Sequence, residues 1–250
     1  MPQCRLLVLR LLRCFLRWRA EPLRLPPGPL LVIAPHPDDE TLGCGGLIMR
    51  ERQTGRRVHI AFLTDGSHSH PGHPTLTPTA LAKLRRAEAI AAADCLGVPA
   101  DNLTFIDLPD GELPRLSPDE YERAVTCLSV LFKNLKPTAT LVAYRRDGSS
   151  EHEAAFTLVT AALKQTQVRP LVIEYLVWAA YSPRLLLRVL FLAGQVHRFN
   201  FPAKGDSKTK ALACYRSQFQ PTPPWDKAVV PPQFANAFSP EEEFFLKLQS

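Results

Sequence analysis

The sequence predicts an α/β protein with a mainly parallel sheet that helices cover on both faces, in three layers. Short runs of aliphatic and β-branched residues recur along the chain, and helix-like segments separate them. Near-continuous apolar strands are typical of such covered parallel sheets, which are built from right-handed βαβ units. The expected strands are 30–34, 57–64, 102–108, 139–144 and 171–178, and the expected helices are 42–54, 79–96, 117–135 and 152–166.

Two stretches refine this pattern. In the third helical segment, Ser117 suits the N-cap position and Pro118 the first helical position. Beyond about residue 180 the pattern becomes irregular, and the proline-rich stretch 218–234 is expected to be a loop packed over the domain. In parallel sheets of this kind, ligands bind beyond the carboxyl ends of the strands, where the strand order reverses. The loops that follow the strands are therefore where a site is expected.

The charge of the chain is concentrated at one end. The formal net charge is +6, but residues 1–25 hold six arginines and one glutamate, which leaves 24 basic and 23 acidic residues in the other 225. The body is thus almost neutral, and we expect no nucleic-acid partner. The six cysteines show no CxxC spacing, which favours reduced thiols and a cytoplasmic location.

Residues 1–25 are predicted to form a basic amphipathic extension of a domain that spans residues 26–250. In a helix, Arg10, Arg13 and Arg17 form a basic stripe opposite Leu9, Leu12 and Leu16. The segment is too interrupted to span a bilayer and lacks the core and cleavage site of a signal peptide. Two interpretations stay open. Residues 1–19 lie on an anionic membrane, at its inner face, or they form a surface helix docked on the body or an extension of little consequence.

The stretch "LVIAPHPDDETLGCGG" (31–46) places a histidine and several carboxylates directly after the first strand. Pro35 and Pro37 hold the backbone extended around His36, and Asp39 follows three residues later. The turn can thus aim an imidazole and a carboxylate at one point, while Asp38 projects differently and can hold a water. Histidine with carboxylate is the ligand set of a catalytic zinc, which keeps one open position.

A further ligand is expected from "RRDGSSEHEA" (145–154), the loop after the fourth strand. His152 lies there near the start of the next helix. The strand that crosses to the other side of the sheet lies beside the first strand, so the two loops meet at the switch point. Acidic residues are also favoured at helix N-termini, and a lone histidine is usually solvated. Two such loops together favour a metal site.

These residues resemble a known family. "APHPDDETLGCGGLI", "FLTDG", "RRAEAIAAADCLGV", "FIDLPDGEL", "RDGSSEHEAA" and "KTKALACYRSQF" are similar, in this order, to the PIG-L/LmbE family of zinc-dependent N-acetylglucosamine deacetylases. The resemblance covers roughly residues 30 to 220. It implies a Rossmann-like fold and a deacetylase domain over residues 26–250. It also implies a metal-dependent hydrolase that removes the acetyl group from an N-acetylglucosamine-type amino sugar. The basic segment 1–25 suggests that this sugar is carried on a lipid or belongs to envelope glycan assembly.

The resemblance also implies roles for individual residues. His36, Asp39 and His152 bind Zn²⁺, although iron or cobalt tolerates the same ligands. Asp38 is the general base. The stretch "SSEH" (149–152) stands where the family has an HxDH motif.

This departure puts one catalytic partner in question. Glu151 replaces the aspartate of the motif, and Ser149 replaces its first histidine. Losing one transition-state donor typically costs about 100- to 1,000-fold in rate. Ser149 donates a weaker hydrogen bond, or a histidine from "DGSHSHPGHP" (65–74) compensates. The alternative function is a catalytically weakened, metal-containing sugar-binding protein.

The family pattern further implies sugar contacts from Arg85 or Arg86 and from Asp110, and His68 is expected to border the site. Cys44 is expected to serve tight helix packing rather than metal binding. Trp178 either stacks on a sugar face or is buried. A nucleotide-binding module is disfavoured, because no GxGxxG follows the first strand and paired carboxylates there repel a pyrophosphate.

Overall fold

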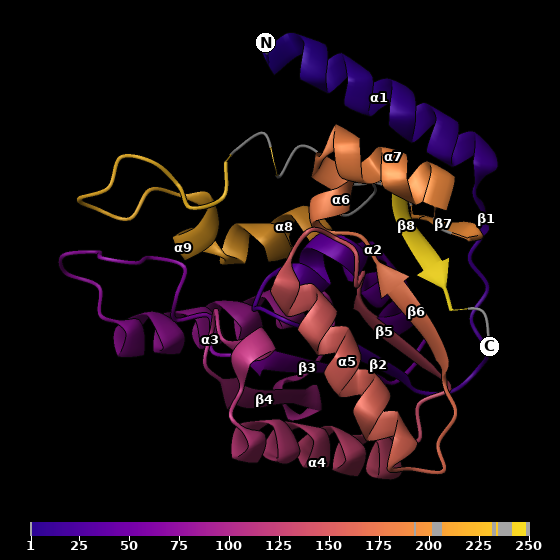
Figure 1. Ribbon diagram of the computed structural model, residues 1–250, viewed down its shortest axis with the longest axis horizontal. Coiled ribbons are helices and arrows are strands. Elements are labelled where there is room, and N and C mark those ends of the chain that lie inside the picture. Colours follow the sequence, from indigo (N-terminus) through magenta and orange to yellow (C-terminus); the bar gives the residue numbers. More distant parts are fainter. Residues whose placement is uncertain (1, 193, 202–206, 232–233, 235–241, 249–250) are drawn as a thin grey trace.

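A computed structural model describes residues 2–192, 194–201, 207–231, 234 and 242–248 (Figure 1). Within this part of the chain the strands form one sheet in the order β1-β7-β8-β6-β5-β2-β3-β4. The strands are β1 Glu21–Pro22, β2 Leu30–Ala34, β3 Val58–Thr64, β4 Leu103–Leu108, β5 Ala139–Ala143, β6 Leu171–Tyr175, β7 Val196–Asn200 and β8 Glu242–Lys247. The α-helices are α1 Pro2–Arg19, α2 Asp39–Gln53, α3 Pro78–Cys95, α4 Pro118–Leu135, α5 Ser150–Lys164, α6 Trp178–Tyr181, α7 Pro183–Leu192, α8 Ser207–Cys214 and α9 Arg216–Phe219.

The sheet is parallel except at β8, which runs antiparallel to both β6 and β7. The chain first builds β2, β3 and β4 in one direction and then crosses back, so that β5 pairs with β2 on its other side. This order creates a switch point between β2 and β5. The predicted fold class, a mainly parallel α/β sheet, is confirmed.

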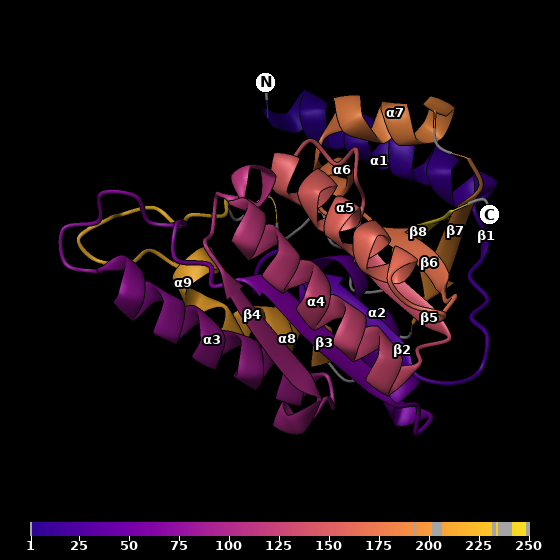
Figure 2. The same ribbon diagram turned by 60° about the horizontal axis from the view of Figure 1, so that its bottom comes forward.

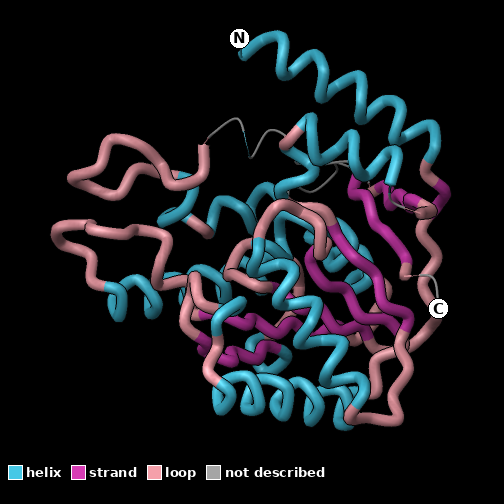
Figure 3. The backbone as a smooth tube through the Cα atoms, viewed as in Figure 1, coloured by secondary structure: helices cyan, strands magenta, loops and turns pink. Residues whose placement is uncertain are grey.

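Helices cover both faces of the sheet, and the strands lie between them (Figures 2 and 3). Alternate residues of the fully buried strand β2 point to opposite faces. Leu30 and Val32 pack toward α2, α3 and α8, whereas Leu31 and Ile33 pack toward α4 and α5. The three predicted layers are therefore present.

Most predicted elements lie within a few residues of their observed bounds. Ser117 does cap α4: its Oγ accepts the backbone N–H of Glu120 at 3.3 Å, and the Glu120 carboxylate accepts the Ser117 N–H at 2.9 Å. The last predicted strand, 171–178, ends earlier, at Tyr175, because the chain turns into α6 at Trp178.

The region beyond residue 180, expected to be irregular, contains α7, β7, α8, α9 and β8. Strand β8 lies inside the sheet between β6 and β7 although it begins with Glu242 and Glu243. Glu243 accepts Lys208 at 2.6 Å and Glu242 accepts Arg17 at 2.7 Å, so both buried charges are paired. Of the predicted loop 218–234, residues 218 and 219 instead belong to α9, residues 220–231 do form a loop, and residues 232–233 lie outside the described part.

Helix α1 is docked on the body. Leu9 and Leu16 are buried in a cluster with residues of α7 and β8, so this predicted apolar face already packs against protein. The boundary between an extension, 1–25, and a domain, 26–250, stays a prediction. In the described part of the chain, no helix has the length and apolarity needed to cross a bilayer.

The glycines behind the first loop allow close packing, as predicted for Cys44 and its neighbours. A Cβ on Gly43 would lie 2.1 Å from the Tyr175 ring, and one on Gly46 would lie 2.2 Å from Phe201. Cys44 is buried in the core and its thiol donates to the Glu40 carbonyl at 3.2 Å. All the cysteines whose side chains the structure describes are free thiols.

Candidate metal centre

The loop after β2 folds a carboxylate back onto a histidine. Asp38, directly before α2, has a φ of 133°, a strained value for a residue other than glycine. This turn places Oδ2 of Asp39 3.0 Å from the backbone nitrogen of His36 and 3.1 Å from its Nδ1. Two residues of one short loop thereby aim their ligand atoms at one point.

His152 reaches the same point from the first turn of α5, beside β5. Its Nδ1 lies 3.0 Å from Oδ2 of Asp147, which is fully buried. The Asp147 carboxylate also accepts the backbone N–H groups of residues 177, 178 and 179, at 3.1, 2.8 and 2.6 Å. Held on this side, the ring turns Nε2 toward Asp39, 3.5 Å from Oδ2.

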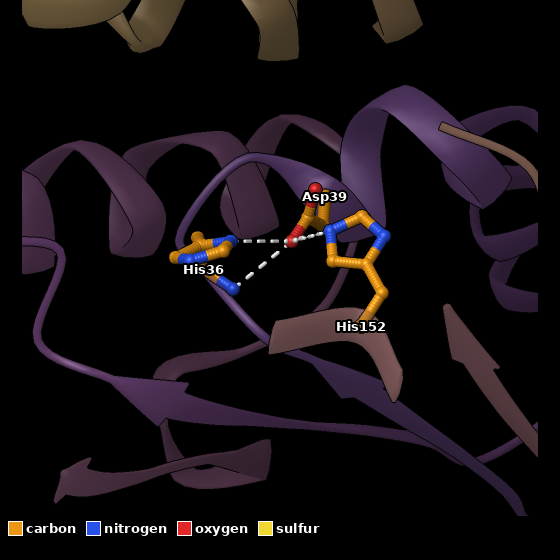
Figure 4. A group of neighbouring side chains, drawn as sticks. All are labelled: His36, Asp39 and His152. Carbon is orange, nitrogen blue, oxygen red and sulfur yellow. Dashed lines mark hydrogen bonds and ion pairs between the residues drawn. The ribbon is translucent and has the colours of Figure 1, made fainter. Parts of the chain in front are cut away.

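The three side chains suit a metal ion (Figure 4). One ligand atom each from His36, Asp39 and His152 lies within 4.8 Å of the others. Nε2 of His152 is buried, and no hydrogen-bond partner reaches it among the described residues. A buried imidazole nitrogen with no partner is costly unless something binds it, so this orphaned atom fits a metal ligand. Two histidines and one carboxylate are a donor set that zinc accepts.

The other ring nitrogen of His36 is held by two carboxylates. Its Nε2 lies 2.5 Å from Oε2 of Glu151 and 3.3 Å from Oδ1 of Asp110. The second oxygen of Glu151 accepts the N–H groups of Gly111 and Leu113, at 2.9 and 3.2 Å. These residues form a second candidate group around the same imidazole. Because backbone N–H groups fix Glu151, its carboxylate can hold the His36 ring in place from the side opposite Asp39.

Asp38 lines the cavity that this centre opens into, which has a volume of about 370 Å³. Its Oδ2 lies 3.4 Å from the guanidinium of Arg85, which also donates to the Pro37 carbonyl. Burial raises the pKa of Asp38 to about 7, although Arg85 opposes the rise. Such a carboxyl can take up or hold a proton near neutral pH.

The charges of the centre stabilise one another. Burial would raise the pKa of Asp39, but the charges of His152 and His36 and the hydrogen bond from His36 outweigh it and lower this pKa. Burial likewise disfavours charge on His152, yet Asp39 and Asp147 raise its pKa to about 9. The centre thus favours an ionised Asp39, the form that binds metal, whereas a metal bound by His152 would displace the proton that this raised pKa retains.

The remaining predicted residues divide into two groups. Ser149 lines the cavity and caps α5, its Oγ accepting the N–H of His152 at 3.4 Å. His68, Arg85 and Asp110 line the cavity too, and Asp110 accepts the backbone N–H of His68 at 2.7 Å. Trp178 stands at the same cavity with 41% of its surface exposed, so it is not a buried aromatic.

Three candidates point elsewhere. Arg86 pairs with Asp107 on the exposed outer side of α3, at 2.6 Å, so Arg85 is the arginine at the cavity. His70 and His73 pack on the Trp225 ring, with centroids 5.3 and 4.9 Å away, and neither lines the cavity. Of the three histidines in that loop, only His68 borders the centre.

The sequence interpretation missed several residues that build the cavity. Asp147 had the signal of a carboxylate just after a strand, but no role was given to it. The Glu88 carboxylate accepts the backbone N–H and the hydroxyl of Ser217, at 2.8 and 2.6 Å. These bonds fix α9, and with it Gln218, at the cavity wall. Glu40 accepts the Tyr215 hydroxyl at 2.6 Å in the same way. The stretch that contains Tyr215 and Ser217, far from the first loop in the sequence, is thus held against the cavity by buried carboxylates.

Together, the switch point and the cavity define an α/β protein with a candidate metal centre at the carboxyl edge of its sheet. The family model described as GlcNAc-PI de-N-acetylase (PIG-L) matches residues 31–163. The chain belongs to this family. The matched segment contains both loops of the centre.

Two curated relatives carry deacetylase names. One is the 1D-myo-inositol 2-acetamido-2-deoxy-alpha-D-glucopyranoside deacetylase of Kineococcus radiotolerans, 34% identical over 88 residues, 34% of this chain. The other is the probable N-acetyl-alpha-D-glucosaminyl L-malate deacetylase 2 of Bacillus subtilis, 32% identical over 146 residues, 56% of this chain. The alignments span only 24% and 64% of the lengths of these relatives.

Solved structures confirm the fold. N,N'-diacetylchitobiose deacetylase from Pyrococcus horikoshii has a TM-score of 0.58 at 21% identity, covering 77% of this chain and 71% of its own. The 4-carboxy-2-hydroxymuconate hydratase GalB from Pseudomonas putida has a TM-score of 0.64 at 18% identity, covering 85% and 83%. One fold thus carries different chemistries, and the reaction has to be argued from the site.

Proposed function

We propose that the chain is a zinc-dependent hydrolase that removes the acetyl group from an N-acetylglucosamine-type amino sugar. One observation carries the proposal: the convergence of His36, Asp39 and His152 at a cavity that Asp38 also lines. Membership of the family and the names of the two relatives support the same reaction. Free thiols favour a reducing compartment, and the cytoplasm remains the proposed location.

In this proposal, His36, Asp39 and His152 hold the zinc ion. A zinc ion bound there polarises a carbonyl oxygen and lowers the pKa of water. Asp38 accepts the proton of the water that attacks the acetamide carbon, and Arg85 keeps the Asp38 carboxylate close to the loop through its contacts with Asp38 and Pro37. The C–N bond then breaks, the acetyl carbon leaves as acetate, and the nitrogen takes up a proton to leave as the amine.

The residues around the cavity suit a sugar. Trp178 offers an exposed ring, while His68, Arg85 and Asp110 offer polar groups at the same wall. An apolar surface with a few convergent polar groups is the usual form of a small-molecule site. The acetamide is thus proposed to lie at the metal centre and the sugar ring between Trp178 and the polar wall.

Metal removal tests the proposal. Chelation is expected to lower acetate release from N-acetylglucosaminyl compounds by more than about 100-fold, and added zinc is expected to restore it. Acetate is measured over a panel of such compounds, with calcium as the control ion, because calcium prefers all-oxygen sites. Undiminished release by protein shown to be metal-free would refute the metal dependence.

Ser149 distinguishes the enzyme from the alternative, a weakened metal-containing sugar-binding protein. Its hydroxyl already accepts the His152 backbone N–H and caps α5, and no histidine of the 65–74 loop other than His68 borders the cavity. If the site is crippled, Ser149→His is expected to raise the rate of acetate release by about 100-fold or more. If Ser149 or His68 manages the proton, the wild type is already fast and the variant gains nothing. Binding of the sugar by calorimetry, measured in both proteins, controls for affinity.

A further inference from the structure

Helix α1 has a second apolar face, which points away from the protein. Leu7, Leu11, Phe15 and Trp18 are exposed by 58, 62, 45 and 79%. Their spacing places them on one side of the helix, opposite the buried Leu9 and Leu16. The sequence pattern predicted only one apolar face, that of Leu9, Leu12 and Leu16, and did not predict this exposed second face.

Helix α7, a neighbour of α1, carries two further exposed apolar residues. It lies beside α1 in both ribbon views and contacts it (Figures 1 and 2). Leu187 is exposed by 40% and Phe191 by 72%. We name these six residues of two neighbouring helices the α1–α7 face: Leu7, Leu11, Phe15, Trp18, Leu187 and Phe191. Exposed patches of this kind mark interaction surfaces.

The charged residues of the two helices have one sign. Neither α1 nor α7 contains an aspartate or glutamate. The exposed basic residues on the two helices are Arg5, Arg10, Arg17, Arg19, Arg184 and Arg188. Several of them also anchor α1: Arg17 binds Glu242 at 2.7 Å, Arg5 reaches the Tyr181 carbonyl at 3.3 Å, and Arg19 donates to the Leu190 carbonyl. These three arginines therefore hold α1 against the body while its outer face stays exposed.

We propose that the α1–α7 face docks the protein on an anionic lipid surface, with both helices lying in the plane of the headgroups. Aromatic and aliphatic side chains flanked by arginines are what this interface binds: the rings sit at headgroup level, and arginine stems cover apolar surface while their charges reach the phosphates. Each basic residue near such a surface adds attraction. A second copy is the poorer occupant, because a two-fold contact would set arginine-rich faces against each other without a carboxylate.

Vesicle flotation with the full chain tests the docking. We expect binding to vesicles of phosphatidylcholine mixed with phosphatidylglycerol, weaker binding to phosphatidylcholine alone, and release by high salt. The double variant Phe15→Ser/Trp18→Ser is expected to bind about tenfold more weakly, because two interfacial side chains are lost. Both positions are exposed, so the fold is expected to persist.

The matched control removes exposed side chains from another part of the surface. Tyr121 and Val130 of α4 are exposed by 39 and 47%, and α4 lies at the opposite end of the view from α1 (Figure 1). Tyr121→Ser/Val130→Ser is expected to bind vesicles like the wild type. The emission of Trp18 is expected to shift to the blue on vesicle addition, and Trp18→Phe is expected to lose most of this shift.

Three results would overturn the docking proposal. The first is equal binding to neutral and anionic vesicles, and the second is binding of Phe15→Ser/Trp18→Ser as tight as that of the wild type. The third is a wild-type dimer in light scattering together with a monomeric Phe15→Ser/Trp18→Ser variant. The last result would assign the face to a second copy. Acetate release from a water-soluble sugar does not depend on the α1–α7 face. A protein that binds vesicles but releases no acetate would contradict only the proposed reaction, and one that releases acetate but does not bind vesicles would contradict only the docking.

Discussion

Replacing Asp38 with asparagine is expected to lower the rate of acetate release by about 100- to 10,000-fold, the usual contribution of a general base. The amide has the shape of the carboxylate but cannot accept the proton of the attacking water. Asparagine also tolerates a positive φ better than most residues, so the turn at 133° is expected to survive. The measurement pairs initial rates of acetate release with the metal content of the purified protein.

The Asp38→Asn variant distinguishes a role of Asp38 as general base from a role as metal ligand. His36, Asp39 and His152 are untouched, so the metal content is expected to equal that of the wild type. Asp107→Asn is the matched control, because Asp107 is an exposed carboxylate paired with Arg86 and does not line the metal cavity. A full rate in Asp38→Asn, or a loss of metal together with rate, would show that Asp38 is not the base.

Replacing Asp147 with alanine is expected to lower the free energy of unfolding by about 3–5 kcal/mol. The carboxylate accepts three backbone N–H groups and orients His152, and all of these partners would lose their acceptor, most of them in buried positions. Since His152 loses its orientation, metal affinity is expected to fall about 10- to 100-fold. Urea unfolding of the metal-free protein measures the first effect, and metal titration of folded protein measures the second.

Asp107→Asn provides the comparison, because it removes the charge of an exposed ion pair that contributes at most about 1 kcal/mol and, unlike alanine, it suits the left-handed φ of 55° at this position. Asp147→Asn is a smaller change: its one amide oxygen can still accept the N–H groups of residues 177 and 178, but the amide nitrogen cannot accept the N–H of residue 179, and the charge beside His152 is lost. If Asp147→Ala unfolded in urea like the wild type and bound metal as tightly, the assigned role of this carboxylate would be wrong.

Much of the centre was predictable because its chemistry lies in short segments. His36, Asp38 and Asp39 share one loop, and the prolines around His36 restrict its backbone. The meeting with His152 followed from a topological rule: in a parallel sheet that crosses over, β5 lies beside β2, and their loops share one edge. The apolar runs of β2, β3 and β5 were recognisable because these strands are buried on both faces.

Other features depended on contacts between segments far apart in the chain. Strand β8 begins with two glutamates, which local patterns assign to the surface, yet Arg17 and Lys208 neutralise them inside the sheet. The choice between Arg85 and Arg86 rested on a rotation of α3 that only packing decides. Helix α1 carries leucines on two faces, and hydrophobicity does not say which of them the body covers.

The sequence by itself determined the α/β class, the two loops that carry the polar side chains and the residue types of a candidate metal centre, because strand burial and loop composition act over a few residues. The tertiary structure decided which groups orient those ligands, which arginine and which histidine reach the cavity, and which face of α1 remains exposed. Buried polar atoms must find partners wherever the fold supplies them, as Asp147 does for His152, and those partners are set by three-dimensional packing rather than by neighbours in the chain.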